Sequence, residues 1–338
     1  RTALRSLGLP GSVVVTDVNP LSPAVHVADR SYRVPMATEP DYLSEVLALC
    51  EAESIRLVVP TIDDELPIFG AARERFSARG TLVACSPEET ALVCNDKFET
   101  CSRLRAAGVA AAETHLTSAM PKDLAPPLFI KPRIGRGGVA AFAIKTQRDL
   151  EFFPGYVPNA VVQEYLDGPE FTIDVLCDLQ GVPVSIVPRE RVVIRAGIMD
   201  RGRTVNDSRL IALAMQACAA IPFVGAINIQ VRMRGNEPAI FEINPRFSGG
   251  ISKLVDYYGA LDVPPSAVGT SAFTAKERSY REWLRHYPRS HLPKMGLALL
   301  SRAEAWRARG GEWATSVSPS AWASFDRHLK ATWSWAEK

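Results

Sequence analysis

The chain has 338 residues, of which 47% are hydrophobic, and this composition predicts a substantial buried core divided among two or three structural units. Its 39 basic residues nearly balance its 37 acidic residues, so the net charge of +2 provides no overall field that would attract nucleic acid or an anionic membrane. Those two classes of partner are therefore not expected.

The first part of the chain, residues 1–88, alternates strand and helix patterns. Short β-branched runs that end in polar residues are typical of buried parallel strands. Between these runs lie segments whose apolar residues have helical spacing. We expect strands at residues 12–16, 56–60 and 81–84, with helices at 39–53 and 66–78. This order predicts an open, parallel α/β layer, and the absence of a GxGxxG motif leaves a dinucleotide site unsupported.

The pattern changes to antiparallel α+β in the middle of the chain. A long helix is expected at residues 88–107, and further strands are expected at 128–131, 140–144, 160–164, 171–178 and 182–187. Residues 209–244 then contain a long helix and two alternating strands, which are joined by a turn at 234–237.

The last segment, residues 271–338, contains all six tryptophans of the chain and has twelve basic residues against six acidic ones. So many large aromatic side chains are not expected to face solvent, because exposed aromatic patches usually mark a contact surface. We predict a separate helical extension that either packs beside a cleft, where its basic residues could help to bind an acidic substrate, or forms a subunit interface. We favour a homodimer interface that also borders the cleft.

Six cysteines are present without a CxxC pair, and they lie mostly in apolar segments, which is typical of buried thiols rather than zinc ligands or disulfides. Residues 210–229 have about the length of a membrane span, but a proline and several polar residues interrupt them. No secretory signal opens the chain. The sequence therefore predicts a cytoplasmic protein without a membrane span.

A candidate phosphate loop lies at residues 129–138, which read FIKPRIGRGG. Glycines let backbone N–H groups approach phosphate oxygens closely, and Lys131 would supply a compact charge at the end of the strand. The alternative interpretation is an exposed Gly-Arg turn between two strands.

A candidate nucleotide hinge follows at residues 161–174, which read VVQEYLDGPEFTID. Backbone groups near Glu164 and Leu166 would recognise a purine edge, and Glu170 would accept hydrogen bonds from ribose hydroxyls. A solvated acidic hairpin is the alternative.

Oxygen-bearing side chains gather on two neighbouring predicted strands, at residues 228–230 (NIQ) and 241–246 (FEINPR). Strand alternation directs Glu242 and Asn244 to the same face, and Mg²⁺ prefers carboxylate and amide oxygens. Arg246 follows immediately, where it would stabilise charge on a transferred phosphoryl group.

In this order and at these spacings, the three segments resemble the ATP-grasp superfamily, and in particular the large-subunit domains of carbamoyl phosphate synthetase. The EINPR run at residues 242–246 is the most specific element, and the likeness covers roughly residues 10–250. The resemblance implies a pre-ATP-grasp α/β domain at 1–88 and a two-lobed ATP-grasp domain at 89–270. Its small lobe would span about 120–188 and its large lobe, with the metal site, about 189–270. The tryptophan-rich extension would follow at 271–338.

The resemblance also implies a role for each candidate residue. The residues expected to bind ATP are Lys97, Lys131, Gly137, Gly138, Glu164, Leu166 and Glu170. Mg²⁺, with Mn²⁺ as the alternative ion, would be held by Gln230, Glu242 and Asn244. The catalytic residues would be Arg246 and Arg195, the second of which stands where the synthetase pattern has a histidine near the nucleotide.

The resemblance implies an ATP-dependent ligase that joins a small carboxylate to an amine through an acyl phosphate, forming an amide or peptide bond. The alternative is a catalytically inactive ATP-binding regulatory module. The apolar helix that usually follows NPRFSGG in this family is not evident after Gly250, so the identities of the acid and the amine stay open. A basic run is interpreted as a solvated face, with an anion-binding site as the alternative; its members are Arg189, Arg191, Arg201 and Arg203.

Overall fold

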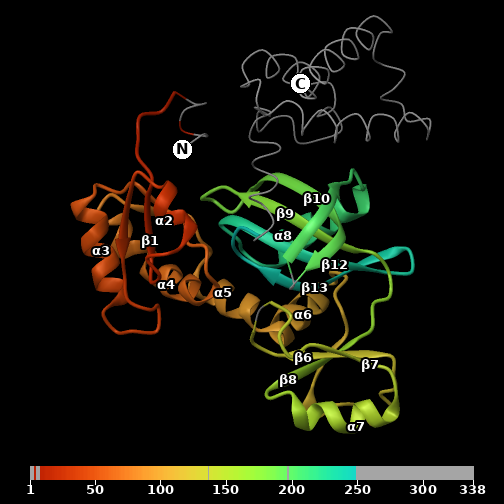
Figure 1. Cartoon of the computed structure of the whole chain (residues 1–338). Coiled ribbons are helices and arrows are strands. Elements are labelled where there is room, and N and C mark those ends of the chain that lie inside the picture. The colour runs from red at the N-terminus through yellow and green to blue at the C-terminus, as the bar shows by residue number, and fades with distance from the viewer. Residues whose placement is uncertain (1–3, 5–7, 136, 196–197, 249–338) are drawn as a thin grey trace, which may run out of the picture. The chain divides into compact units, whose positions relative to one another are not determined.

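The computed structural model describes residue 4 and residues 8–135, 137–195 and 198–248, all of which lie in one compact unit, Arg1–Leu254. This part of the chain contains an N-terminal α/β region, a four-stranded sheet and a five-stranded sheet (Figure 1). The predicted tryptophan-rich extension and the segment after Gly250 lie outside the described residues. Within the described ranges, no helix combines the length and apolar character needed to cross a bilayer.

The N-terminal region has the predicted parallel α/β character. Strand β1 (Val14–Asp17) pairs in parallel with β2 (Arg30–Arg33), and β3 (Leu57–Val58) pairs in parallel with β4 (Leu82–Val83). The helical segments between them are α2 (Pro23–Val27), α3 (Tyr42–Ala52), the 3₁₀ helix η1 (Asp63–Glu65) and α4 (Leu66–Ser77). Strand β2 was not predicted from the sequence. All four of its residues are exposed, so its sequence lacks the apolar alternation that marks a half-buried strand.

The single helix predicted at 88–107 is wrong, because the structure has two helices there. They are α5 (Glu88–Asn95) and α6 (Lys97–Ala106), separated by Asp96 in an extended conformation. The Asp96 carboxylate accepts hydrogen bonds from the backbone N–H groups of Phe98 and Glu99, at 3.0 and 3.2 Å, and so caps α6. The break places Lys97 at the first residue of the second helix.

The four-stranded sheet is antiparallel, in the order β5-β8-β6-β7. Its strands are β5 (Thr114–Leu116), β6 (Leu128–Pro132), β7 (Phe142–Ile144) and β8 (Ala160–Glu164), with the 3₁₀ helix η2 (Thr117–Ala119) after β5. Helix α7 (Gln147–Tyr156) begins at a capping box made by Thr146 and Asp149. Its Leu150 packs with Ile130 and Val162 in the core of this sheet.

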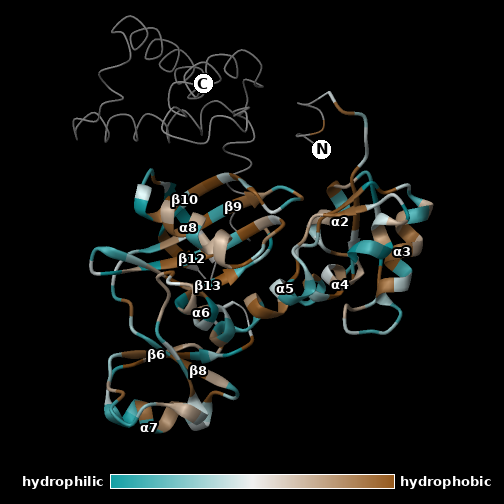
Figure 2. Ribbon diagram, turned by 180° about the vertical axis from the view of Figure 1, so that it is seen from behind, coloured by the Kyte–Doolittle hydropathy of each residue, from teal (hydrophilic) through white to brown (hydrophobic). Residues whose placement is uncertain are grey.

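The five-stranded sheet is also antiparallel, in the order β11-β10-β9-β12-β13. Its strands are β9 (Glu170–Cys177), β10 (Pro183–Arg195), β11 (Ile198–Thr204), β12 (Gly225–Arg234) and β13 (Glu237–Asn244). Helix α8 (Ser208–Ala220) packs Leu210 and Ala214 against Ile173 and Ile229 of the sheet. Figure 2 shows hydrophobic colouring along much of these strands, as expected where a helix covers one face.

The predicted lobe boundary at residue 188 does not coincide with the division between the sheets. Strand β9 pairs with β12 from Glu170 to Cys177, and β10 continues the same sheet, so the change of sheet comes at residues 165–169. The hydrophobic pattern could not reveal this, because a strand's alternation is the same whichever sheet it joins. The remaining domain boundaries stay predictions.

The end of the N-terminal region packs directly against the start of β12. Gly225 has a φ of 81°, and a Cβ atom there would lie 2.7 Å from the backbone oxygen of Ala84. The backbone N–H of Val224 donates to the Ser86 hydroxyl at 3.1 Å, and the Thr90 hydroxyl donates to the Pro222 carbonyl at 2.9 Å. These contacts join two segments that are about 140 residues apart in the sequence.

We predict that Gly225→Ala destabilises the protein more than Gly235→Ala. Both glycines have positive φ, which costs an L-residue about 1–2 kcal/mol, but a Cβ at Gly235 would meet nothing within 4 Å. The collision with Ala84 should add at least about 1 kcal/mol at Gly225, because a packed backbone must shift to relieve it. Thermal or urea unfolding of the two variants measures the difference, and equal losses would contradict it.

Candidate active site

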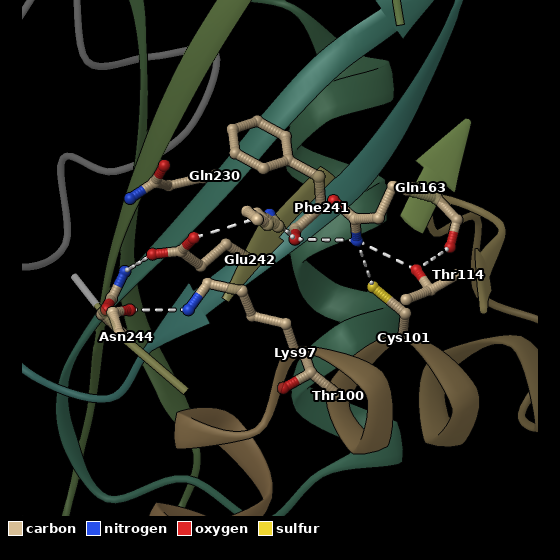
Figure 3. A network of polar contacts seen from close by, with 12 residues as sticks. Lys97, Thr100, Cys101, Thr114, Gln163, Gln230, Phe241, Glu242 and Asn244 are labelled. Carbon is tan, nitrogen blue, oxygen red and sulfur yellow. Dashed lines mark hydrogen bonds and ion pairs between the residues drawn. The ribbon is translucent and has the colours of Figure 1, made fainter. Parts of the chain in front are cut away.

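A β-bulge in strand β13 shapes the centre of the candidate site. Gln230 pairs with Glu242, but the next pair is Val231 with Ile240, so Phe241 is an extra residue in the ladder. The Phe241 carbonyl oxygen accepts a hydrogen bond from the Lys131 ammonium at 3.2 Å and a weaker one from the Gln163 amide at 3.5 Å. The bulge thus connects the five-stranded sheet to β6 and β8 of the four-stranded sheet (Figure 3).

The three residues predicted to hold a metal ion lie together on β12 and β13. The Asn244 amide donates to Glu242 Oε1 at 3.3 Å, so these two side chains share a face, as strand alternation predicts. Gln230 is the cross-strand partner of Glu242, and its side chain lies on the same side in Figure 3. The set offers one carboxylate and two amide oxygens, which suits a hard divalent cation.

Protein carboxylates alone do not complete a metal site here. Among the described residues, no group of three or more histidine, cysteine, aspartate or glutamate side chains is arranged to hold a metal ion. A cation at Gln230, Glu242 and Asn244 would therefore need further oxygen ligands from water or from a bound substrate. This is the usual arrangement for Mg²⁺, which keeps several waters and binds phosphate oxygens.

Two buried lysines approach these residues from different elements. Lys131 of β6 is 6% exposed and lies 3.7 Å from Glu242 Oε2, and Lys97 of α6 is 5% exposed and donates to the Gly135 carbonyl at 2.6 Å. Lys97 is therefore a buried cation, not a side chain in solvent. Burial lowers the pKa of Lys131, and the nearby charge of Lys97 lowers it further, whereas Glu242 raises it.

A cavity of about 200 Å³ opens beside these groups. Its polar lining comes from three parts of the chain, namely the N-terminal region, helices α5 and α6, and the end of β13. The lining includes Asp63, Asp64, Asn95, Lys97, Glu242 and Asn244. The sequence did not identify the two aspartates as site residues, although they follow a predicted strand in the polar cluster TIDDE.

The predicted phosphate loop has the backbone that its glycines allow. Gly137 and Gly138 adopt φ values of 72° and 68°, and Gly135 lines the cavity. Residues other than glycine rarely adopt such angles, so the sequence is matched to this conformation. Arg133 leaves the loop to pair with Asp96, with a distance of 2.7 Å from Nε to Oδ2.

The residues predicted to bind a nucleoside lie at the start of β9 and the end of β8. Glu170 forms ion pairs with Arg191 and Arg232, at 2.8 and 2.9 Å. The Leu166 carbonyl accepts from Arg232 at 3.0 Å. Glu164 pairs with Arg234 and accepts from the backbone N–H of Glu113, so its side chain supports the hinge.

The interpretation of the basic run as a solvated face is wrong for Arg189 and Arg191. Arg189 is 1% exposed, pairs with Asp174 and donates to the Ser248 hydroxyl at 2.9 Å. The Arg191 side chain is 6% exposed and donates to Gln230 Oε1 at 3.4 Å, so it lies between Glu170 and the candidate metal ligands. Their spacing of two residues in a strand is the signal that places both on one face.

The two predicted catalytic arginines differ in what surrounds them. Arg195 is the last residue of β10, and its side chain is not among the described ones. Arg246 follows β13 and pairs with Asp63 through two hydrogen bonds of 2.6 and 2.7 Å. Arg246 is therefore oriented by the N-terminal region.

Two family models match separate regions of the chain. The model described as "PylC-like, N-terminal domain" matches residues 2–84, and the one described as "ATP-grasp in the biosynthetic pathway with Ter operon" matches residues 156–272. The second range contains the whole five-stranded sheet and therefore all three candidate metal ligands.

One curated relative and two solved structures are similar over most of the chain. The carbamoyl phosphate synthase arginine-specific large chain of Bacillus subtilis (strain 168) is 21% identical over an alignment of 281 residues, and the match covers 77% of this chain and 26% of that protein. An L-amino acid ligase from Bacillus licheniformis has a TM-score of 0.58 and 20% identity, covering 74% of this chain and 64% of that one. The N5-carboxyaminoimidazole synthetase of Staphylococcus aureus, complexed with ADP, has a TM-score of 0.61 and 15% identity, with coverages of 75% and 69%.

The chain spans about a quarter of the length of the curated relative, and the structural similarity at 15–20% identity establishes a shared fold.

We predict opposite effects of two neighbouring substitutions on the pKa of Lys131 in metal-free buffer. Glu242→Gln should lower this pKa further, because it removes the carboxylate that favours the ammonium form. Lys97→Met should raise it, because it removes a nearby positive charge. An NMR pH titration of ¹³C-labelled lysine measures both, with the Lys131→Arg spectrum identifying the resonance. Shifts of the same sign would contradict the electrostatic arrangement.

Proposed function

Because this chain belongs to the ATP-grasp superfamily, we propose that it is an ATP-dependent ligase that joins a carboxylate to an amine through an acyl phosphate. The observation that carries the proposal is the meeting of Lys131, Glu242 and Asn244 beside a polar cavity. These residues come from two different sheets, and together they supply a buried cation and oxygen ligands for a metal–nucleotide complex.

The nucleotide would lie between the two sheets, with its phosphates toward the buried lysines. Lys97, Lys131 and the loop glycines Gly137 and Gly138 would contact phosphate oxygens. At the other end, the backbone near Glu164 and Leu166 would bind the adenine edge, and Glu170 would hold the ribose. We add Arg191 to this set, because its side chain links Glu170 to Gln230 and so lies between the ribose end and the metal end.

Gln230, Glu242 and Asn244 would hold Mg²⁺, and Mn²⁺ accepts the same oxygen ligands. When bound, the ion would neutralise phosphate charge and orient the terminal phosphate. Glu242 contributes the only carboxylate of this set, so its charge should matter more than either amide. Glu242 and Lys131 contact each other before the nucleotide binds. When a metal ion and a phosphate bind together, Glu242 would coordinate the metal ion and Lys131 would bind the phosphate.

The reaction that this site suits has two steps. A carboxylate oxygen of the acid attacks the γ-phosphorus of ATP and displaces ADP, which forms the acyl phosphate. The amine nitrogen then attacks the carbonyl carbon, phosphate leaves and the amine loses a proton, so that an amide or peptide bond forms. Lys131 and Arg246 would stabilise the charge on the transferred phosphoryl group, and Arg195 would act near the nucleotide.

The similar proteins support a ligase without identifying its substrates. Their names describe an L-amino acid ligase, a carboxyaminoimidazole synthetase bound to ADP and a carbamoyl phosphate synthase. An inactive ATP-binding module is disfavoured, because this chain retains the lysine, carboxylate and amide set in contact. Small-molecule acids and amines are therefore the proposed substrates.

We also infer a homodimer in which residues 271–338 form part of the interface, from the tryptophan and arginine content of that segment. The molecular mass in solution of the full chain and of a chain ending at Thr270 tests this inference.

The proposed reaction is tested by measuring ADP and phosphate release with ATP, Mg²⁺ and panels of small acids and amines. We expect release to depend on both an acid and an amine. Hydroxylamine should replace the amine and convert the acyl phosphate to a hydroxamate, whose mass identifies the acid. Tight ATP binding without release above background for any pair would instead indicate a regulatory module.

We predict that Glu242→Gln lowers turnover by at least about 100-fold, because the change removes the only carboxylate of the proposed metal site while nearly preserving its shape. The remaining activity should require higher Mg²⁺. Glu237→Gln is the matched control, because Glu237 is an exposed residue at the other end of the same strand. A Glu242→Gln variant that keeps more than half of its activity at low Mg²⁺ would refute the metal assignment.

A further inference from the structure

A two-point ion pair joins the N-terminal region to the end of the catalytic strand. Arg246 donates through Nε to Asp63 Oδ1 at 2.6 Å and through Nη2 to Asp63 Oδ2 at 2.7 Å. The two side chains are 17% and 13% exposed, so the pair is largely screened from solvent. Paired arginine and carboxylate groups of this geometry fix the plane of the guanidinium as well as its position.

The remaining bonds of Arg246 leave donors for a substrate. Nη1 donates to the Phe247 carbonyl at 3.0 Å, and the backbone N–H of Arg246 donates to the Asn244 carbonyl at 2.8 Å. A guanidinium has five N–H groups, and the three side-chain bonds use three of them. Two N–H groups can therefore take oxygens of a substrate while the other three hold the orientation.

The segment that carries Asp63 is itself held in place. It is the 3₁₀ helix η1, whose last residue, Glu65, accepts a hydrogen bond from the hydroxyl of buried Tyr42 at 2.7 Å. Burial raises the pKa of Glu65, although the bond from Tyr42 opposes that rise. Asp63 is thus presented by a segment attached to helix α3, and its neighbour Asp64 lines the cavity with it.

The ion pair is not needed to attach the N-terminal region to the five-stranded sheet. That contact is already made by Gly225 against Ala84 and by the hydrogen bonds of Ser86 and Thr90. The principal effect of Asp63 is therefore on the orientation of Arg246, next to cavity-lining Asn244 and Pro245.

We propose that Asp63 is a positioning residue for Arg246, so that the N-terminal region completes the site of phosphoryl transfer. This proposal rests on the proposed ligase function. Asp63 fixes the guanidinium before substrates bind, and the reaction then gains charge stabilisation without a search for the correct orientation.

The test is a double-mutant cycle on ligase turnover with Asp63→Ala, Arg246→Ala and the double variant. We expect Asp63→Ala to lower kcat about 10- to 100-fold with less than about a threefold change in the KM for ATP, since a misplaced group costs the transition state most. In the Arg246→Ala background, Asp63→Ala should change kcat less than about twofold, because its partner is gone. Asp63→Glu should recover part of the rate, because it restores the charge.

Glu51→Gln is the control for a lost ion pair elsewhere in the N-terminal region, because Glu51 pairs with Arg79 in an exposed contact. It should leave kcat unchanged. An unchanged kcat in Asp63→Ala, or independent effects in the double variant, would overturn the proposal. An equal loss of kcat in Asp63→Ala and in the control Glu51→Gln would also overturn the proposal.

A second measurement separates this proposal from the function on which it rests. In ¹⁵N-arginine spectra without substrates, the Nε–H of Arg246 should exchange slowly with water, and Asp63→Asn should accelerate that exchange at least about tenfold. Unchanged exchange would overturn the positioning role whether or not the protein is a ligase. A wild-type chain that turns over no acid and amine, yet shows the accelerated exchange, would refute the ligase function and leave the orientation of Arg246 by Asp63 supported.

Discussion

The candidate site depends on one backbone carbonyl, that of Phe241. Phe241 is the extra residue of a bulge in β13, the edge strand of its sheet, and its carbonyl accepts from Lys131 of β6 and Gln163 of β8. Gln163 is itself held by the Thr114 hydroxyl at 2.9 Å. The bond from Lys131 to this carbonyl holds the ammonium group beside Glu242.

Buried charges in this site stabilise one another, at a cost in desolvation. Lys131 and Arg191 have pKa values lowered by burial, and the carboxylates of Glu242 and Glu170 oppose those shifts. An uncompensated charge in such surroundings would cost several kcal/mol, so each group depends on its partner. A polar arrangement of this kind is poor for stability but suits a site that binds a metal ion and several phosphates, because the incoming charges find partners already in place.

The N-terminal region contributes directly to this arrangement. Asp63 and Asp64 line the same cavity as Lys97 and Glu242, although they precede the metal-site strand by almost 180 residues. The close approach of Gly225 to Ala84 sets where this region meets the sheet. The packing that joins the two regions therefore also determines which groups face the reacting atoms.

The sequence by itself determined the local patterns of this protein. Alternation along β13 placed Glu242 and Asn244 on one face, and residues 129–138 predicted a glycine-rich loop, in which Gly137 and Gly138 adopt positive φ. The order of three short motifs was enough to indicate the superfamily. Such features follow from periodicity and backbone preference, which act over a few residues.

Only the tertiary structure decided which of these residues meet and which charges are buried. The sequence interpreted Arg191 as part of a solvated basic run, with an anion-binding site as the alternative, it joined α5 and α6 into one helix, and it gave Asp63 no role. The burial of Lys97, the burial of Arg191 and the ion pair of Asp63 each depend on a contact with a distant segment: Gly135 for Lys97, Glu170 for Arg191 and Arg246 for Asp63. Strand and helix periodicity carries no information about such contacts, because burial of a charge is set by the partner that the fold brings to it.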